Sequence, residues 1–242
     1  MLPPNWEVPE EFRRRLGEQA GRQRLMQADG HLLLVLHAPP SPDSNVREGR
    51  LFWRDPTGRW TPSGASPAQP GLGDLLGQYE SAIEQLQADE DEAKTARQYF
   101  QLLNRLNPLA RTARNLYETI QSAREAASDD RQLLLWRDRA YVIARAADLL
   151  HGDAKNALEF AIAERAEQEA ESSRRAASAA ARLNLLVACF FPVATLAAIF
   201  GVNLRHGLES WDRQYAPLPL LAMLVSGLAL GLLLMLAINR RR

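Results

Sequence analysis

The chain has 242 residues, which is enough for one large domain or two small ones with a sizeable buried core. Charged residues make up 24% of it and hydrophobic residues 46%, which excludes collagen-like, low-complexity and wholly disordered classes. The charges are unevenly distributed, because residues 183–242 hold only five of the 29 basic and two of the 29 acidic side chains. The sequence therefore predicts a polar body followed by a membrane hairpin. It argues against a wholly soluble enzyme and against a basic nucleic-acid-binding protein.

Residues 1–70 predict a short cytoplasmic segment with two or three strands. The first 30 residues are charged, and we expect one helix there, at Glu10–Ala20. The apolar run His31–His37 is followed by Ala-Pro-Pro-Ser-Pro and is typical of a buried strand. Residues Gly49–Arg54 and Arg59–Trp60, separated by Asp-Pro-Thr-Gly, predict a small hairpin.

Residues 71–182 predict a cytoplasmic helical region with antiparallel helices and a stalk. A linker rich in Pro, Gly, Ser and Ala precedes it at 61–73. Apolar residues follow helical spacing over 75–86 and again over 99–106. We expect Pro108 to end this run and to lie in the first turn of a further helix that extends to about Ala127.

A single long helix follows. Ser128, Asp129 and Asp130 provide an N-cap and an acidic first turn. No helix breaker follows, so the helix extends from about 130 to 203, roughly 110 Å at 1.5 Å per residue. A helix of this length cannot bury itself, and its many alanines allow neighbouring helices to approach closely. The stalk therefore predicts a homo-oligomer with closed rotational symmetry.

Two uncharged stretches predict transmembrane helices at 183–204 and 216–239. They contain 22 and 24 residues, so each is over about 30 Å long, the thickness of the bilayer core. Basic residues precede the first stretch and follow the second: Arg174, Arg175, Arg182, Arg240, Arg241 and Arg242. The positive-inside rule then places both termini, with the basic tail 240–242, in the cytoplasm and the loop 205–215 outside. The sequence predicts a multi-pass protein of the inner (plasma) membrane; two buried helices of a soluble protein are the alternative.

Several motifs resemble the CorA family of divalent-cation transporters. Phe191-Pro-Val-Ala-Thr-Leu-Ala-Ala-Ile-Phe-Gly-Val-Asn203 resembles the end of that family's first membrane helix, where Gly-Met-Asn ends eleven residues after a proline. Glu209 lies where the family's external loop has a glutamate. Leu102–Arg111 resembles a run that the family has before the stalk. Trp136-Arg137-Asp138 resembles a run at the head of the family's stalk helix. The resemblance covers about 71–242.

The resemblance implies a pentameric pore that passes Mg²⁺ down its electrochemical gradient. Gly201, Val202 and Asn203 would select the ion, because a ring of amide oxygens can hydrogen-bond the waters that Mg²⁺ is reluctant to lose. Glu209 and Asp212 would attract cations to the outer mouth, partly offset by Arg205 and Arg213. The residues that would line the pore are Ala180, Leu183, Val187, Phe191 and Ala194; lipid contact or interhelical packing is the alternative for each.

Two departures from the family pattern leave alternatives to a Mg²⁺ channel open. Val202 replaces the usual methionine, and such Gly-Val-Asn variants resemble ZntB-type relatives that transport zinc. A Zn²⁺ transporter, coupled to protons, is therefore one alternative, and a CorA-like scaffold that does not conduct is another. Co²⁺ and Ni²⁺ are further candidate ions. The family also has a large α/β domain before the stalk, whereas residues 1–70 are too short for it.

The family resemblance also implies a regulatory cytosolic metal, held by an aspartate near the head of the stalk. Asp138 matches that aspartate, although pairing with neighbouring charges is equally open. Glu171 and Arg175 predict an i,i+4 ion pair on a solvated helix face. Among the histidines, only His206 lies near the outer mouth, where Zn²⁺ would be encountered. No catalytic triad, phosphate loop or paired catalytic carboxylates are found, so we expect no enzyme and no resident cofactor.

Overall fold

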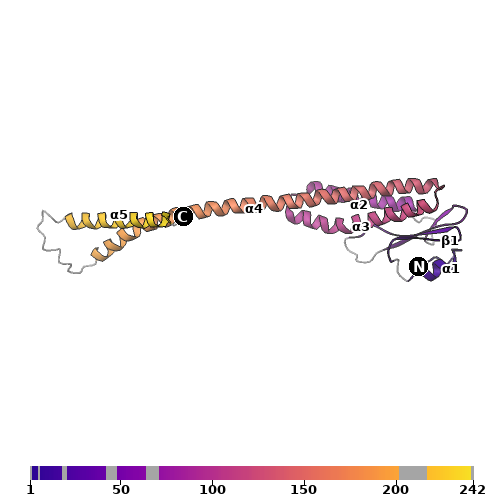
Figure 1. The fold of residues 1–242 in the computed structure, drawn as a ribbon, viewed down its shortest axis with the longest axis horizontal. Coiled ribbons are helices and arrows are strands. Elements are labelled where there is room, and N and C mark those ends of the chain that lie inside the picture. Colours follow the sequence, from indigo (N-terminus) through magenta and orange to yellow (C-terminus); the bar gives the residue numbers. More distant parts are fainter. Residues whose placement is uncertain are drawn as a thin grey trace. The chain divides into compact units, whose positions relative to one another are not determined.

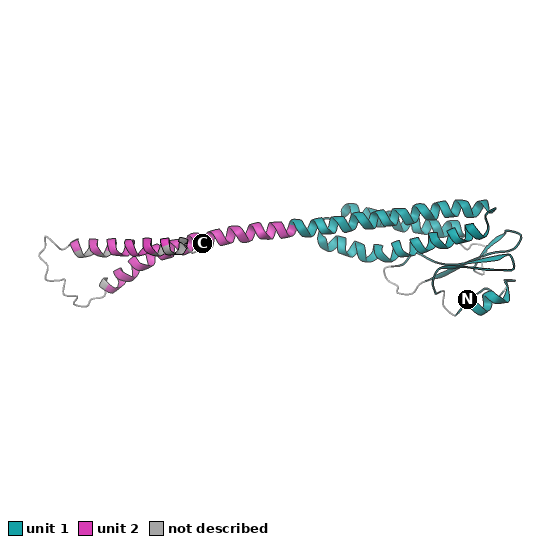
Figure 2. Cartoon of the chain, viewed as in Figure 1, with its two compact units in different colours: residues 1–164 teal, residues 165–242 magenta. Residues whose placement is uncertain are grey.

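The computed structural model describes residues 2–4, 6–17, 21–41, 48–63, 71–201 and 217–240. It divides the chain into two compact units, Met1–Glu164 and Arg165–Arg242 (Figure 2). The first unit contains a short helix, a sheet and a helical body. The second contains the end of one long helix and the last helix of the chain. Most of the described residues are helical, as the sequence predicts.

A four-stranded antiparallel sheet forms the N-terminal part of the first unit. Its strands follow chain order: β1 (Arg24–Ala28), β2 (His31–His37), β3 (Gly49–Arg54) and β4 (Trp60–Pro62). Asp29 and Gly30 both have positive φ and join β1 to β2, with Ala28 opposite His31. Two positive-φ residues are what a tight two-residue hairpin turn requires. The strand predicted at His31–His37 is confirmed as β2. The hairpin predicted after Gly49 is confirmed by the antiparallel pairing of β3 with β4.

Both faces of the sheet are covered. Leu34, Leu36 and Phe52 join the main core formed with the helices, and α3 packs on β1 and β2. On the other face, Leu33 and Val35 pack with Phe12 of α1 (Glu10–Arg15) in a smaller core. Figure 1 shows the sheet between α1 and α3. Burial on both faces explains why β2 is a continuous apolar run rather than an alternating one.

Three antiparallel helical segments form the rest of the first unit. They are α2 (Leu72–Glu92), α3 (Ala96–Ala126) and the first part of α4 (Arg131–Gly201), which lie side by side in Figure 1. Thr95 caps α3 in a capping box with Gln98. The residues of α4 that join the main core recur every three and four positions: Leu133, Trp136, Ala140, Ile143, Ala147, Leu150 and Ala154.

Four expectations are corrected. The sheet has four strands instead of two or three, because β1 also pairs. The first helix is shorter than Glu10–Ala20 and ends at Arg15. Pro108 lies inside α3 and does not end a helix. The linker expected over 61–73 is narrower, because β4 extends to Pro62 and α2 starts at Leu72.

The long helix expected from about 130 to 203 is present as α4, and it crosses the division between the two units. Its first residue, Arg131, directly follows the predicted cap Asp130. Its last described residue is Gly201, so the final two expected residues lie outside the described part of the chain. The last described helix, α5 (Pro217–Arg240), contains residues 217–239 of the second apolar stretch, and residue 216 lies outside the described part of the chain.

Candidate functional site

Helix α5 packs on α4 through two glycines in the second unit. Gly227 and Gly231 are spaced i,i+4 and both are buried. A Cβ atom at Gly227 would lie 2.9 Å from Val193 Cγ2. A Cβ atom at Gly231 would lie 3.0 Å from both Cα and the carbonyl oxygen of Cys189. Only glycine allows this approach, which is the Gly-x-x-x-Gly packing found between membrane helices.

The expected pore-lining residues lie on the face of α4 that α5 leaves uncovered. Leu183, Val187 and Phe191 are 62%, 53% and 67% exposed within the chain, and Ala180 and Ala194 are exposed as well. At about 100° per residue, this stripe lies roughly opposite the α5-facing residues Cys189 and Val193. The structure thus groups the five predicted residues on one face. What they contact outside the chain remains a prediction.

Pro192 interrupts the hydrogen bonding of α4 within this hairpin. It lies inside the helix and is buried. Because proline has no N–H, the carbonyl of Ala188 loses its usual helical partner. Gly231 faces that carbonyl, since a Cβ atom on it would lie 3.4 Å from the Ala188 oxygen. Thr195 Oγ1 donates to the Phe191 carbonyl at 2.8 Å, one turn away.

The expected selectivity residues are only partly described. Gly201 is the last residue of α4. Val202, Asn203, Glu209 and Asp212 lie outside the described residues. The role of each as an ion-selecting or cation-attracting residue therefore stays a prediction.

Asp138 lies on the first part of α4, where its side chain is exposed. Its Oδ1 atom is 3.3 Å from Nε of the adjacent Arg137, which agrees with the alternative of pairing with a neighbouring charge. Within the described ranges, no group of three or more His, Cys, Asp or Glu side chains is placed to hold a metal ion. A regulatory metal at Asp138 stays a prediction.

A second exposed stripe runs along the first part of α4. Leu135, Val142 and Leu149 are seven residues apart and are 58%, 63% and 49% exposed. They lie on the side of α4 away from the seam that packs on the helical body. One apolar residue per seven gives a narrower stripe than the two per seven of a coiled-coil seam.

Asp130 joins the sheet to the start of α4, a role that the sequence analysis missed. Its Oδ2 atom accepts hydrogen bonds from Arg54 Nε at 2.9 Å and from Trp60 Nε1 at 3.0 Å. Its Oδ1 atom accepts from the amides of Gln132 and Leu133, which confirms the predicted cap. Burial alone would raise the pKa of Asp130, but these hydrogen bonds outweigh it and the pKa is lowered.

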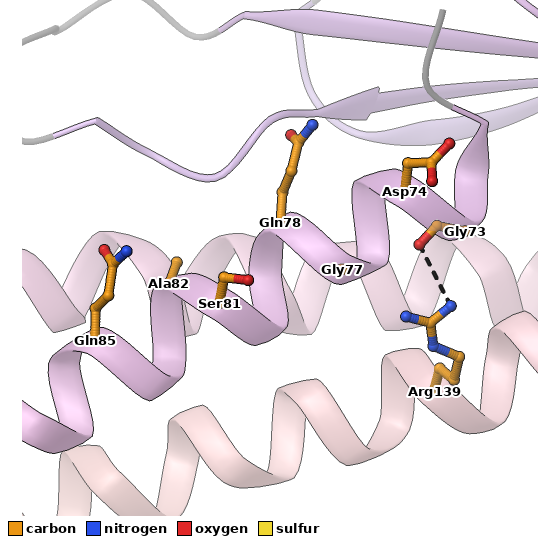
Figure 3. Close-up of a pocket in the computed structure, with 8 residues that line it drawn as sticks. All are labelled: Gly73, Asp74, Gly77, Gln78, Ser81, Ala82, Gln85 and Arg139. Carbon is orange, nitrogen blue, oxygen red and sulfur yellow. Dashed lines mark hydrogen bonds between the residues drawn. The ribbon is translucent and has the colours of Figure 1, made fainter.

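Arg139 joins α4 to α2 beside an open depression. Its guanidinium binds both carboxylate oxygens of Glu80, at 3.1 and 2.8 Å, and donates to the Gly73 carbonyl at 3.3 Å. The depression has a volume of about 860 Å³ and is shown in Figure 3. Its lining residues are mostly small or uncharged: Gly73, Asp74, Gly77, Gln78, Ser81, Ala82, Gln85 and Arg139. Among the described residues that line it, no buried polar group points to a ligand.

By length and composition, α4 is the described helix that can cross a bilayer. Its candidate range is Arg131–Ile199, and a shorter apolar stretch lies in α5 at Leu224–Leu233. The described part of the chain therefore contains an apolar helical hairpin.

Solved structures share the fold of this chain, although no protein-family model and no curated protein matches it. The cytoplasmic domain of ZntB from Vibrio parahaemolyticus RIMD 2210633 matches with a TM-score of 0.54 at 13% identity, covering 66% of this chain and 80% of that one. The full-length CmaX protein matches with a TM-score of 0.59 at 15% identity, covering 97% of this chain and 81% of that one.

A third match is the complete CorA magnesium transporter from Methanocaldococcus jannaschii, with a TM-score of 0.37 at 10% identity, over 94% of this chain and 82% of that one. The first two matches show the fold. The chain has the fold seen in the ZntB cytoplasmic domain and in CmaX: a small antiparallel sheet, a helical body and a long helix.

Proposed function

We propose that this chain is a subunit of a homo-oligomeric, membrane-embedded divalent-cation channel with a CorA-like pore. The observation that carries the proposal is the α4–α5 hairpin. Its glycine contacts bring α5 against one face of α4 and leave the opposite face, from Ala180 to Ala194, uncovered. An inner helix that lines a pore and an outer helix that shields it need this division of faces. The fold shared with CmaX over 97% of this chain supports the same assignment.

The hairpin is proposed to span the inner membrane with both termini in the cytoplasm. Each apolar stretch is long enough for the bilayer core. Arg182 before α4 enters the membrane and Arg240 at the end of α5 would both lie at the cytoplasmic surface. The freed Ala188 carbonyl would lie within the membrane, where the close backbone of Gly231 shields it from hydrocarbon.

The uncovered stripe Leu135, Val142 and Leu149 supports the homo-oligomer. In a single chain it would expose three large apolar side chains on one helix face to water. In a closed ring, a neighbouring copy of α4 would cover these side chains in every subunit. A pentamer is the number that the family resemblance implies.

The ion path is proposed to begin at a ring of Asn203 carboxamides. Neutral amide oxygens hydrogen-bond the hydration shell of Mg²⁺ without stripping it, and they release the ion because the contact is weak. Below the ring, Phe191 and Leu183 form apolar constrictions that can close by dewetting. Passage is driven by the membrane potential, which is worth about 2.3 kcal/mol per charge per 100 mV.

Ion flux into liposomes tests the proposal. The purified chain is expected to pass Mg²⁺, to be blocked by cobalt hexammine, which mimics hydrated Mg²⁺, and to lose its flux in Asn203→Ala. Asn239→Ala is the matched control, because it removes a carboxamide near the other end of α5, away from the proposed ring. Unchanged flux in Asn203→Ala would reject the ring. No flux of any ion by the oligomer would favour a non-conducting scaffold.

A zinc transporter is the second candidate, favoured by the fold shared with the cytoplasmic domain of ZntB. The same assay separates it from the first when Mg²⁺, Zn²⁺, Co²⁺ and Ni²⁺ are compared. Zinc transport coupled to protons predicts Zn²⁺ uptake that rises with an inward proton gradient. Mg²⁺ flux that ignores the gradient would leave the channel as the function.

A further inference from the structure

The uncovered face of α4 continues as a stripe of small residues before the hairpin. The stripe consists of two series of residues, each with a spacing of seven. The first series is Ala194, Val187, Ala180, Ser173 and Ala166, and the second is Phe191, Asn184, Ala177 and Ala170. All of the small residues in this stripe are exposed in the chain. Small residues allow a close approach of helices but do not fix their order or direction. Charges at the edges of the stripe can do so.

Glu169 and Arg174 lie at opposite edges of this stripe. At about 100° per residue, each lies roughly 70° from the centre of the stripe, on either side of it. When two copies of a helix pack in parallel, the two edges of the stripe meet between them. A residue at one edge in the first copy then lies beside the residue five positions later, at the opposite edge, in the second copy. Glu169 and Arg174 have this spacing and opposite charges. The preceding pair at these edges, Ile162 with Glu167, and the following one, Ala176 with Ala181, have no opposite charges.

Both side chains have capacity for such a contact. Glu169 receives Arg165 Nε on Oε1 at 3.1 Å, and its Oε2 atom accepts no hydrogen bond from any described residue. Arg174 is exposed and has no ion-pair partner among the described residues. By contrast, Glu171 and Arg175 pair with each other on the outer side of the helix, as the sequence predicts.

We propose that Glu169 of one copy pairs with Arg174 of the next copy, and that this contact sets the parallel register of the α4 helices around the stalk. The inference rests on the proposed homo-oligomer and names the residues that orient it. Each copy uses Glu169 toward one neighbour and Arg174 toward the other. A closed ring therefore contains as many of these pairs as it has copies.

A charge swap in the full-length chain tests the pair. Glu169→Arg and Arg174→Glu each place like charges at every interface. Either variant is expected to raise the apparent dissociation constant of the detergent-purified oligomer by about tenfold or more, since small losses multiply around a ring. The double variant restores opposite charges and is expected to return to within about threefold of the unmodified chain. A double variant that is no more stable than the single ones would overturn the pair.

The matched control is the outer pair. Glu171→Arg and Arg175→Glu make the same charge changes and also break an i,i+4 pair within the helix, but they lie away from the stripe. They are expected to leave the oligomer unchanged. Equal damage from these variants would show that helix stability, and not an intersubunit pair, is being measured.

Cross-linking gives a second readout. In a Cys189→Ser background, copies with Glu169→Cys are mixed with copies with Arg174→Cys and treated with a short bismaleimide. The pair predicts a cross-linked dimer in the mixture and little in either variant alone; the reverse pattern would reject the parallel register. A monomeric unmodified chain would reject the proposed oligomer itself. An oligomer that fails the swap and the cross-link rejects only this pair.

Discussion

At the scale of single residues, Asp130 is the side chain that joins three elements of the first unit, β3, β4 and α4. One oxygen holds Arg54 of β3 and Trp60 of β4, and the other caps α4. Trp60 also packs edge-on against Trp136 of α4 at 5.5 Å between ring centres. A displacement of the sheet would therefore act directly on the first turns of the helix that continues toward the hairpin.

Asp130→Asn is expected to destabilise the first unit by about 2 kcal/mol. Asparagine still caps α4, but it removes the charge that holds Arg54 and replaces one acceptor oxygen with an NH₂ group. Thermal unfolding followed by circular dichroism measures the loss. Asp129→Asn, an exposed neighbour with the same chemical change, is expected to have no effect.

The pH dependence of the unfolding free energy of the same two variants tests whether Asp130 stabilises the first unit in its ionised form. The pKa of Asp130 is lower in the folded chain than in the unfolded one. Its contribution is therefore complete above about pH 4, the ordinary pKa of aspartate, and is lost as the pH falls further. The stability difference between the unmodified chain and Asp130→Asn should shrink below that pH. A constant difference would contradict the ionised role of Asp130.

At the scale of elements, the sequence predicts best where one pattern decides the structure. The run His31–His37 and the cap at Asp130 are such cases, and both are confirmed. β1 was missed because Arg24–Ala28 alternates weakly, although Asp29-Gly30 is a hairpin signal that could have revealed it. The continuity of α3 through Pro108 depends on tertiary packing, which no local pattern reports.

Pro108 shows how packing overrides a helix breaker. Leu106 and Leu109 on either side of it are buried in the main core, so their burial holds the helix on both sides. Pro108 itself lies on the exposed face, where water can hydrate the carbonyl of Asn104 that loses its partner. Thr112 Oγ1 donates to the Pro108 carbonyl at 2.5 Å, which holds the following turn.

The candidate site was predictable in part. The family resemblance named five pore-lining residues between Ala180 and Ala194, and in the structure all five are exposed on α4; their role in a pore stays a prediction. Which face α5 would cover was not predicted, although Gly227-Leu-Ala-Leu-Gly231 is a recognisable packing motif. Such a motif indicates a close helix contact but does not identify the residues on the partner helix. Those residues depend on the orientation of each helix about its own axis.

Gly231→Val is expected to open the α4–α5 hairpin. The added side chain would meet the backbone of Cys189, which cannot move aside as a flexible side chain can. Cys189 is the single cysteine of the chain, so its reaction rate with a maleimide reports the opening. The rate should rise in Gly231→Val and stay unchanged in Ala229→Val, which adds the same bulk at an exposed position of α5. Equal rates in both variants would contradict the glycine contact.

At the scale of the whole molecule, α4 begins in the first unit and ends in the second, and it packs against different helices in each. In the first unit it buries one side against α2 and α3 and leaves Leu135, Val142 and Leu149 uncovered. In the second unit it buries one side against α5 and leaves Phe191 uncovered. In each unit, α4 therefore buries one side within the chain and leaves large apolar side chains uncovered on another.

Val142→Glu tests whether the first part of α4 contacts a second copy, without unfolding the subunit. Val142 is 63% exposed in the single chain, so a carboxylate there costs little in an isolated copy. In an oligomer the same substitution places a carboxylate from every copy in one shared seam, where desolvation and mutual repulsion both oppose assembly. Particle mass in detergent is expected to fall toward that of the monomer. Phe100→Glu, at an exposed apolar residue of α3, should leave the mass unchanged. An oligomer that survives Val142→Glu would place the first part of α4 outside the subunit contact and restrict association to the hairpin.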